Sequence, residues 1–142
     1  MPLLNTLSIL LSTASLLSAL PSSTDTAIHS RAPCTPDAGN SASTDDVPAI
    51  RNAISSCGNG GTIVIPQGST YYLNSVLDFK GCTGCDFQVE GLLKFTGDTD
   101  YWEGKTAMMS VSDIDGIKIR SLTGEGVIDG NGQDAYVLNL TT

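Results

Sequence analysis

The chain has 142 residues, the length of a single domain, with 15 acidic and 7 basic side chains and a net charge of −8. This acidic balance argues against nucleic acid or an anionic membrane surface as a partner, because both would repel the chain. Charged residues make up only 15% of the chain and apolar residues 40%, which favours a folded, turn-rich protein over a disordered acidic tail.

The first 20 residues carry no charged side chain and are rich in leucine. This composition predicts a secretory signal peptide over residues 1–20. A membrane anchor would need about 20 predominantly apolar residues and usually basic flanks, whereas serine and threonine are scattered through this stretch. We interpret residues 21–33, which are rich in serine and threonine, as a pro-segment or linker. We therefore expect a secreted, extracellular protein that has no membrane contact after the signal is removed.

The four cysteines are Cys34, Cys57, Cys82 and Cys85. An even number is typical of an oxidising compartment, and three pairings are compatible with the sequence. The CxxC spacing of the last two also occurs in zinc and redox sites. A zinc site would need a second ligand pair, and the single histidine, His29, lies in the predicted processed segment. We favour two structural disulfides, Cys34–Cys57 and Cys82–Cys85, and we expect no metal and no cofactor.

Residues 47–57 are predicted to form a helix. Aspartate precedes it, proline stands in its first turn, and Gly58 follows it. The apolar face of this helix is formed by Val47, Ile50, Ile54 and Cys57. The adjacent Asp45 and Asp46 could be a catalytic pair, but their position before the helix favours a helix cap.

The rest of the chain has the pattern of short strands with a glycine at almost every corner, and no later segment has helical periodicity. The predicted strands cover residues 62–65, 71–73, 87–90, 92–95, 107–111, 117–119 and 127–128. Strands of this length suit a sandwich, a small barrel or a parallel β-helix. The fold class is therefore all-β.

A loose repeat favours the β-helix among these three. Residues 88–93, 114–119 and 126–130 share a pattern of aliphatic residue, acid and glycine, and recur at spacings of about 25 and 12 residues. Hairpin signals are poor. In a parallel β-helix, the helix over residues 47–57 would cap the open N-terminal end of the stack.

Four segments carry a resemblance to a known family: residues 34–56, 60–66, 71–75 and 124–132. They resemble fungal polygalacturonases, the pectin-hydrolysing glycoside hydrolases, and look closest to the exo-polygalacturonase and the xylogalacturonan or rhamnogalacturonan hydrolase branches. The resemblance extends over residues 34–136, whereas the tail over residues 137–142 departs from the family. It implies a right-handed parallel β-helix, a pectic polysaccharide as partner, and hydrolysis with inversion by two carboxyl groups.

The functional motifs of that family do not match this chain. The family draws its catalytic groups from an Asn-Thr-Asp segment and a nearby Asp-Asp pair, and it binds the uronate with Gly-His-Gly and Arg-Ile-Lys. This sequence has no Asn-Thr-Asp, His29 lies outside the matched region, and Lys118-Ile119-Arg120 has the reverse order. We therefore assign no catalytic residue and expect an N-terminal portion that is inactive by itself.

Tyr101 and Trp102 are the candidate substrate-binding residues, because aromatic faces stack on sugar rings. Packing over a loop is the alternative, and we favour it. Asn139 begins an Asn-Leu-Thr glycosylation pattern near the end of the chain.

Two acidic pairs, Asp98 with Asp100 and Asp113 with Asp115, could hold calcium through their oxygen atoms. Neither pair continues into a calcium loop, so we favour solvated turns.

Three functional hypotheses follow. The chain could belong to a pectin-directed hydrolase, be a secreted non-catalytic module that binds cell-wall polysaccharide or occupies an inhibitor, or be a non-functional gene fragment. A last coil without a cap would expose a strand edge and apolar side chains, which predicts marginal stability or self-association.

Overall fold

The computed structural model describes residues 31–133, 135 and 136. The predicted signal peptide, nearly all of the predicted pro-segment, His29, Asn139 and the tail over residues 137–142 lie outside the described residues. Within the described part, none of the helices has the length and apolar character needed to cross a membrane.

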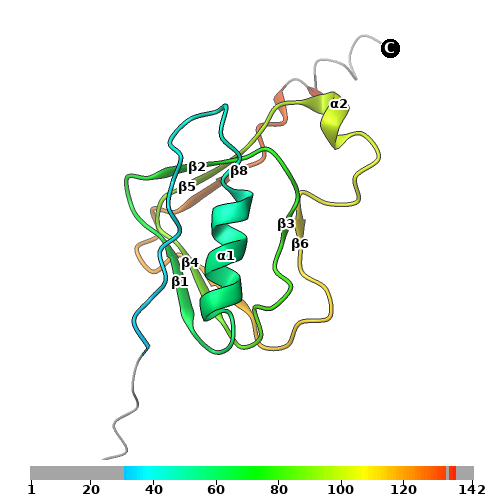
Figure 1. Ribbon diagram of the computed structural model, residues 1–142. Coiled ribbons are helices and arrows are strands. Elements are labelled where there is room, and N and C mark those ends of the chain that lie inside the picture. Colours follow the sequence, from blue (N-terminus) through cyan, green and yellow to red (C-terminus); the bar gives the residue numbers. More distant parts are fainter. Residues whose placement is uncertain (1–30, 134, 137–142) are drawn as a thin grey trace, which may run out of the picture.

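The strands form three parallel sheets that surround one core (Figure 1). The first sheet has the order β1-β4-β7, the second β2-β5-β8, and the third β3-β6. The elements are β1 (Thr62–Ile65), β2 (Thr70–Leu73), β3 (Leu77–Asp78), β4 (Asp86–Val89), β5 (Leu92–Phe95), β6 (Met109–Ser110), β7 (Lys118–Arg120) and β8 (Val127–Asp129), with helices α1 (Val47–Cys57) and α2 (Thr99–Trp102).

Each sheet pairs a strand of one coil with the equivalent strand of the next, which makes the fold a parallel β-helix, as predicted. Strand β1 pairs with β4, β2 with β5, and β3 with β6; the third coil adds β7 and β8. In the first sheet Thr62 aligns with Asp86 and Asp86 with Lys118, so the coils are 24 and then 32 residues long.

The repeat read from the sequence is wrong in its period. Residues 114–119 and 126–130 lie on different sheets of the same coil, so their spacing of about 12 residues is not a coil length. The stacked equivalents are different positions: Leu92 aligns with Val127, which places Gly126 beneath Gly91. A Cβ atom on Gly126 would overlap the carbonyl group of Val89, so this corner requires glycine.

Helix α1 covers the N-terminal end of the stack, as predicted. It lies in front of the ring of sheets in Figure 1, and its buried face joins the core through Val47, Ile50, Ala53, Ile54 and Cys57. The helix ends at Gly58, where a Cβ atom would overlap the carbonyl oxygens of Gly81 and Ile54. A bridge from Cys34 to Ile63 extends the first sheet one step beyond β1 on the same side.

The core is a stack of inward-facing side chains from the first two coils. Alternate residues of β1, β2, β4 and β5 are buried, as the two-residue period of a strand requires. Phe79 and Phe87 meet edge to face, with ring centroids 5.0 Å apart. The structure joins Cys34 to Cys57 and Cys82 to Cys85, the pairing favoured from the sequence, with Cα atoms 6.2 and 5.2 Å apart.

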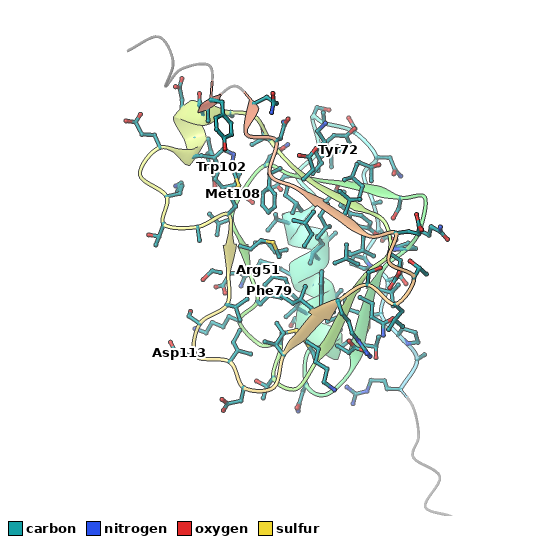
Figure 2. All side chains as sticks on the ribbon, turned by 180° about the vertical axis from the view of Figure 1, so that it is seen from behind. Arg51, Tyr72, Phe79, Trp102, Met108 and Asp113 are labelled. Carbon is teal, nitrogen blue, oxygen red and sulfur yellow. A yellow bond between two sulfur atoms is a disulfide. The ribbon has the colours of Figure 1, made fainter. Side chains whose placement is uncertain are left out.

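The third coil leaves its inward-facing side chains open. Ile119 stacks beneath Phe87 and Ile128 beneath Leu93, yet they are 38% and 47% exposed, whereas the residues above them are fully buried. Figure 2, seen from behind, presents this coil to the viewer. We call the side chains of Ile119 and Ile128 the open end of the stack.

Two elements differ from the sequence prediction. The structure adds the two-residue strand β3 and the four-residue helix α2, in a region predicted to contain no helix. The side chain of Asp98 accepts a hydrogen bond from the backbone N–H of Tyr101 at 3.0 Å, which caps α2. A single turn fixed by one cap is too short to show helical periodicity.

Candidate functional site

The main hollow among the described residues lies where the second sheet ends. Lys94 aligns with Asp129, so the chain leaving β5 runs directly above the chain leaving β8. The upper segment forms α2, and the lower segment turns at Asn131, whose φ is +48° and whose N–H donates to Oδ1 of Asp129 at 2.8 Å. The hollow between them has a volume of about 510 Å³ and is lined by Thr96, Gly97, Thr99, Asp100, Trp102, Glu103, Met108, Gly130, Asn131, Gly132 and Ala135.

The two aromatic candidates are brought together but have different environments. The indole N–H of Trp102 donates to the carbonyl oxygen of Thr96 at 2.8 Å, and its ring meets Phe95 edge to face at 5.8 Å. Tyr101 lies edge-on to Trp102 at 4.8 Å and carries Lys105 over its ring at 4.9 Å. Trp102 packs against the core and also lines the hollow together with Met108, which lies close to it in Figure 2.

Asp45 and Asp46 hold the start of α1 against β2. Asp46 is 2% exposed, and its carboxylate accepts the N–H groups of Gly39 and Tyr72, each at 2.7 Å. The predicted cap is only partly right: Asp46 stands at the N-cap position without a side-chain cap bond, whereas Asp45 accepts Val47 N–H at 3.2 Å. Asp45 also accepts the N–H of Asn74 at 3.0 Å. These hydrogen bonds give both carboxylates a structural role at the start of α1.

Lys118 and Arg120 lie on the exposed face of β7. Arg120 makes two hydrogen bonds to Asp86 on the strand above, at 2.8 and 2.6 Å, and this interaction lowers the pKa of the Asp86 carboxyl group. The guanidinium therefore uses two of its five N–H donors on a carboxylate of its own chain, which partly neutralises its charge.

Glu90 is a residue that the sequence reasoning missed. It is 9% exposed at the corner between β4 and β5, and its carboxylate accepts the N–H of Leu122 at 2.6 Å and that of Thr123 at 3.0 Å. The hydroxyls of Ser121 and Thr123 also donate to it. The hydrogen bond from Leu122 and those from Thr123 lower the pKa of Glu90 to about 2. Its hydrogen-bond partners are more than 30 residues away in the sequence, so no local sequence pattern predicts them.

The candidate calcium ligands are dispersed in the structure. Asp98 caps α2 and Asp100 lies in its first turn. Asp113 and Asp115 are exposed, and Figure 2 shows Asp113 near the opposite end of the molecule. Within residues 31–133, 135 and 136, no group of three or more histidine, cysteine, aspartate or glutamate side chains is arranged to hold a metal ion.

Comparisons with known proteins place the chain beside one group of enzymes. It is 73% identical over 114 residues to a probable endo-xylogalacturonan hydrolase A of Aspergillus niger, an alignment that covers 80% of this chain and 28% of the relative. It is 68% identical over 133 residues to the endo-xylogalacturonan hydrolase A of Aspergillus tubingensis, covering 91% of this chain and 33% of that enzyme. The chain thus spans about a third of the length of these relatives.

A solved structure agrees with both alignments. The crystal structure of the endo-xylogalacturonan hydrolase from Aspergillus tubingensis superposes with a TM-score of 0.76 at 72% identity, over 78% of this chain and 30% of that one. No family model matches the chain.

Proposed function

We propose that this chain, which matches the N-terminal portion of polygalacturonase-like glycoside hydrolases, works in the endo-acting hydrolysis of xylogalacturonan. The observation that carries this proposal is the 72% identity to a xylogalacturonan hydrolase whose backbone has the same coils. The superposition extends over 78% of this chain, so the likeness covers most of the sequence and is not confined to one segment.

The role we propose for the described coils is structural support of the active site. Inverting hydrolysis needs one carboxylic acid that protonates the leaving oxygen and one carboxylate that activates water. The sequence contains no Asn-Thr-Asp segment, and its one adjacent aspartate pair, Asp45 and Asp46, accepts backbone hydrogen bonds at the start of α1. We therefore place the catalytic carboxyl groups outside the described residues.

We also propose that the protein is secreted. The leucine-rich, uncharged residues 1–20 support export, and both disulfides of the described region fit an oxidising compartment. An extracellular location would also bring the chain to its polysaccharide.

A second candidate function is polysaccharide binding without catalysis. The hollow between α2 and the segment of residues 130–132 with Ala135 favours it, because a sugar could bind there without any catalytic group. This function is compatible with the first, since a hydrolase also has to hold its polymer.

A chimeric enzyme tests the proposed function. Residues 34–132 of this chain would replace the matching residues of the Aspergillus tubingensis enzyme, and release of reducing ends from xylogalacturonan would be measured beside the parent enzyme. We expect the rate of the chimera to stay within about tenfold of the parent rate. This corresponds to a change of no more than about 1.4 kcal/mol in the activation barrier. A chimera that unfolds cooperatively yet leaves xylogalacturonan intact would contradict the proposal.

A further inference from the structure

The lining of the hollow beside α2 indicates which kind of sugar it binds. We propose that it binds a neutral pentose, of the kind that xylogalacturonan carries as a branch, and that it disfavours the galacturonate of the polymer backbone. This inference rests on the proposed function for its choice of polymer, and on the lining of the hollow for its choice of sugar.

The lining has the composition of a sugar site. A volume of about 510 Å³ lies within the range of about 300–1,000 Å³ that is typical of small-molecule sites. Trp102 and Met108 supply apolar surface for the C–H face of a pyranose ring, and Thr99 and Asn131 supply polar groups for its hydroxyls. Thr99 and Trp102 are three residues apart in α2, and Asn131 belongs to the segment that follows β8.

Trp102 is fixed before a ligand arrives. Its N–H is bound to the carbonyl oxygen of Thr96, and Phe95 holds its ring edge to face. The indole therefore offers the hollow ring surface rather than a hydrogen-bond donor. A side chain that is already ordered loses little conformational entropy on binding, which favours affinity for a small ligand.

Charge decides between the two kinds of sugar. Asp100 and Glu103 line the hollow, and its described lining contains no lysine or arginine. Lys105 follows α2, but its ammonium group lies over the ring of Tyr101, and neither residue lines the hollow. A uronate in the hollow would have its carboxylate beside two like charges, whereas a pentose carries no charge and meets no such repulsion.

The two walls belong to successive coils, because α2 follows β5, whereas residues 130–132 and Ala135 follow β8. The hollow therefore exists only when the second and third coils are stacked. Binding of a sugar would therefore also show that the second and third coils are stacked.

Trp102 is the single tryptophan of the chain, so its fluorescence reports on this hollow directly. The full chain would be titrated at neutral pH with methyl β-xylopyranoside and, at equal ionic strength, with sodium galacturonate. We expect a saturable fluorescence change with the xyloside and at least about tenfold weaker binding of galacturonate, as two adjacent like charges would cause.

Variants separate the contributions of hydroxyl and charge. Thr99→Val keeps the side-chain shape and removes one hydroxyl, and it should weaken xyloside binding about fivefold. The double variant Asp100→Asn/Glu103→Gln removes the repulsion and should bring galacturonate binding to within about threefold of xyloside binding. The matched control Asp113→Asn/Asp115→Asn removes the same charge from two exposed positions that do not line the hollow, and it should change neither titration.

Two results would overturn the inference: no fluorescence change with the xyloside, or galacturonate binding as tightly as the xyloside to the unmodified chain. Either result leaves the chimera assay unaffected. If the chimera hydrolyses xylogalacturonan but the chain does not bind the xyloside, the proposed function is supported and this inference is wrong. An inactive chimera with a pentose-binding hollow would give the reverse outcome.

Discussion

The carboxylate of Glu90 accepts the backbone N–H of Leu122 at 2.6 Å, joining the corner of the second coil to the turn that precedes β8 in the third. Thr123 and the hydroxyl of Ser121 donate to the same carboxylate. The carboxylate of Glu90 thus accepts hydrogen bonds from three consecutive residues of one turn. Because these bonds connect consecutive coils, they help to set where the third coil lies on the second.

Replacing Glu90 by glutamine is predicted to destabilise the chain at neutral pH and to flatten its pH dependence. The folded pKa of about 2 lies below the ordinary value of 4.5, so ionised Glu90 favours the folded state. This contribution is fully present above about pH 4.5 and is lost as the pH falls towards 2. Urea unfolding midpoints measured from pH 7 downwards would show it. A variant whose midpoint falls with acid as steeply as that of the unmodified chain would refute this role.

Gly126→Ala is predicted to destabilise the chain by about 1–3 kcal/mol, the usual cost of forcing an extra group into a packed interior. A Cβ at this position overlaps the Val89 carbonyl of the coil above. Gly130→Ala is the control, since its Cβ would meet no atom within 4 Å, and it should stay within about 0.5 kcal/mol of the unmodified chain. Equal stabilities for the two variants in denaturant unfolding would show that the coils are not in the described register.

The open end of the stack is predicted to drive self-association. Ile128→Asp should reduce it, because a charge would replace an inward-facing side chain that is 47% exposed. Val127→Asp is the matched control: Val127 is 50% exposed on the same strand but faces outward, so its effect should be smaller. Sedimentation velocity over a range of concentrations measures both. A monomer at every concentration in the unmodified chain would contradict the prediction.

The chain alone is predicted to release no reducing ends from xylogalacturonan or from polygalacturonate. The reason is that the sequence lacks the Asn-Thr-Asp segment, and that Asp46, Asp86 and Glu90 are already engaged by backbone N–H groups or by an arginine. A colorimetric reducing-end assay on the purified chain, with the Aspergillus tubingensis enzyme as positive control, checks this. Reducing-end release that grows in proportion to chain concentration would overturn it.

The parts of the fold that were predicted correctly are those with local signals. The face of α1 from Val47 to Cys57 and the alternation in β1 and β5 follow from periodicity within a few residues. Strand β3 was missed because two residues contain no period, and α2 because a single cap at Asp98 forms it. The coil length was wrong because loops of different length separate the equivalent strands, so Gly91 and Gly126 stack although no fixed spacing connects them.

The candidate site was predictable only in part, for the same reason. Tyr101 and Trp102 could be named as aromatic candidates from the sequence, but the opposite wall of the hollow, at Gly130 to Gly132, is brought there by the pairing of β5 with β8. Glu90 gave no signal at all, since its partners at residues 121–123 are distant in the chain. Residues whose role depends on stacking become visible only once the register is known.

The most direct test of the central claim is the preference of the chimeric enzyme for its polymer. The ratio of hydrolysis rates on xylogalacturonan and on unsubstituted polygalacturonate would be measured for the chimera and for the parent Aspergillus tubingensis enzyme. If these coils are the N-terminal support of a xylogalacturonan hydrolase, the two ratios should agree to within about threefold, less than 1 kcal/mol of difference in barrier. A folded chimera that cleaves polygalacturonate in preference to xylogalacturonan, or that cleaves neither, would contradict the account.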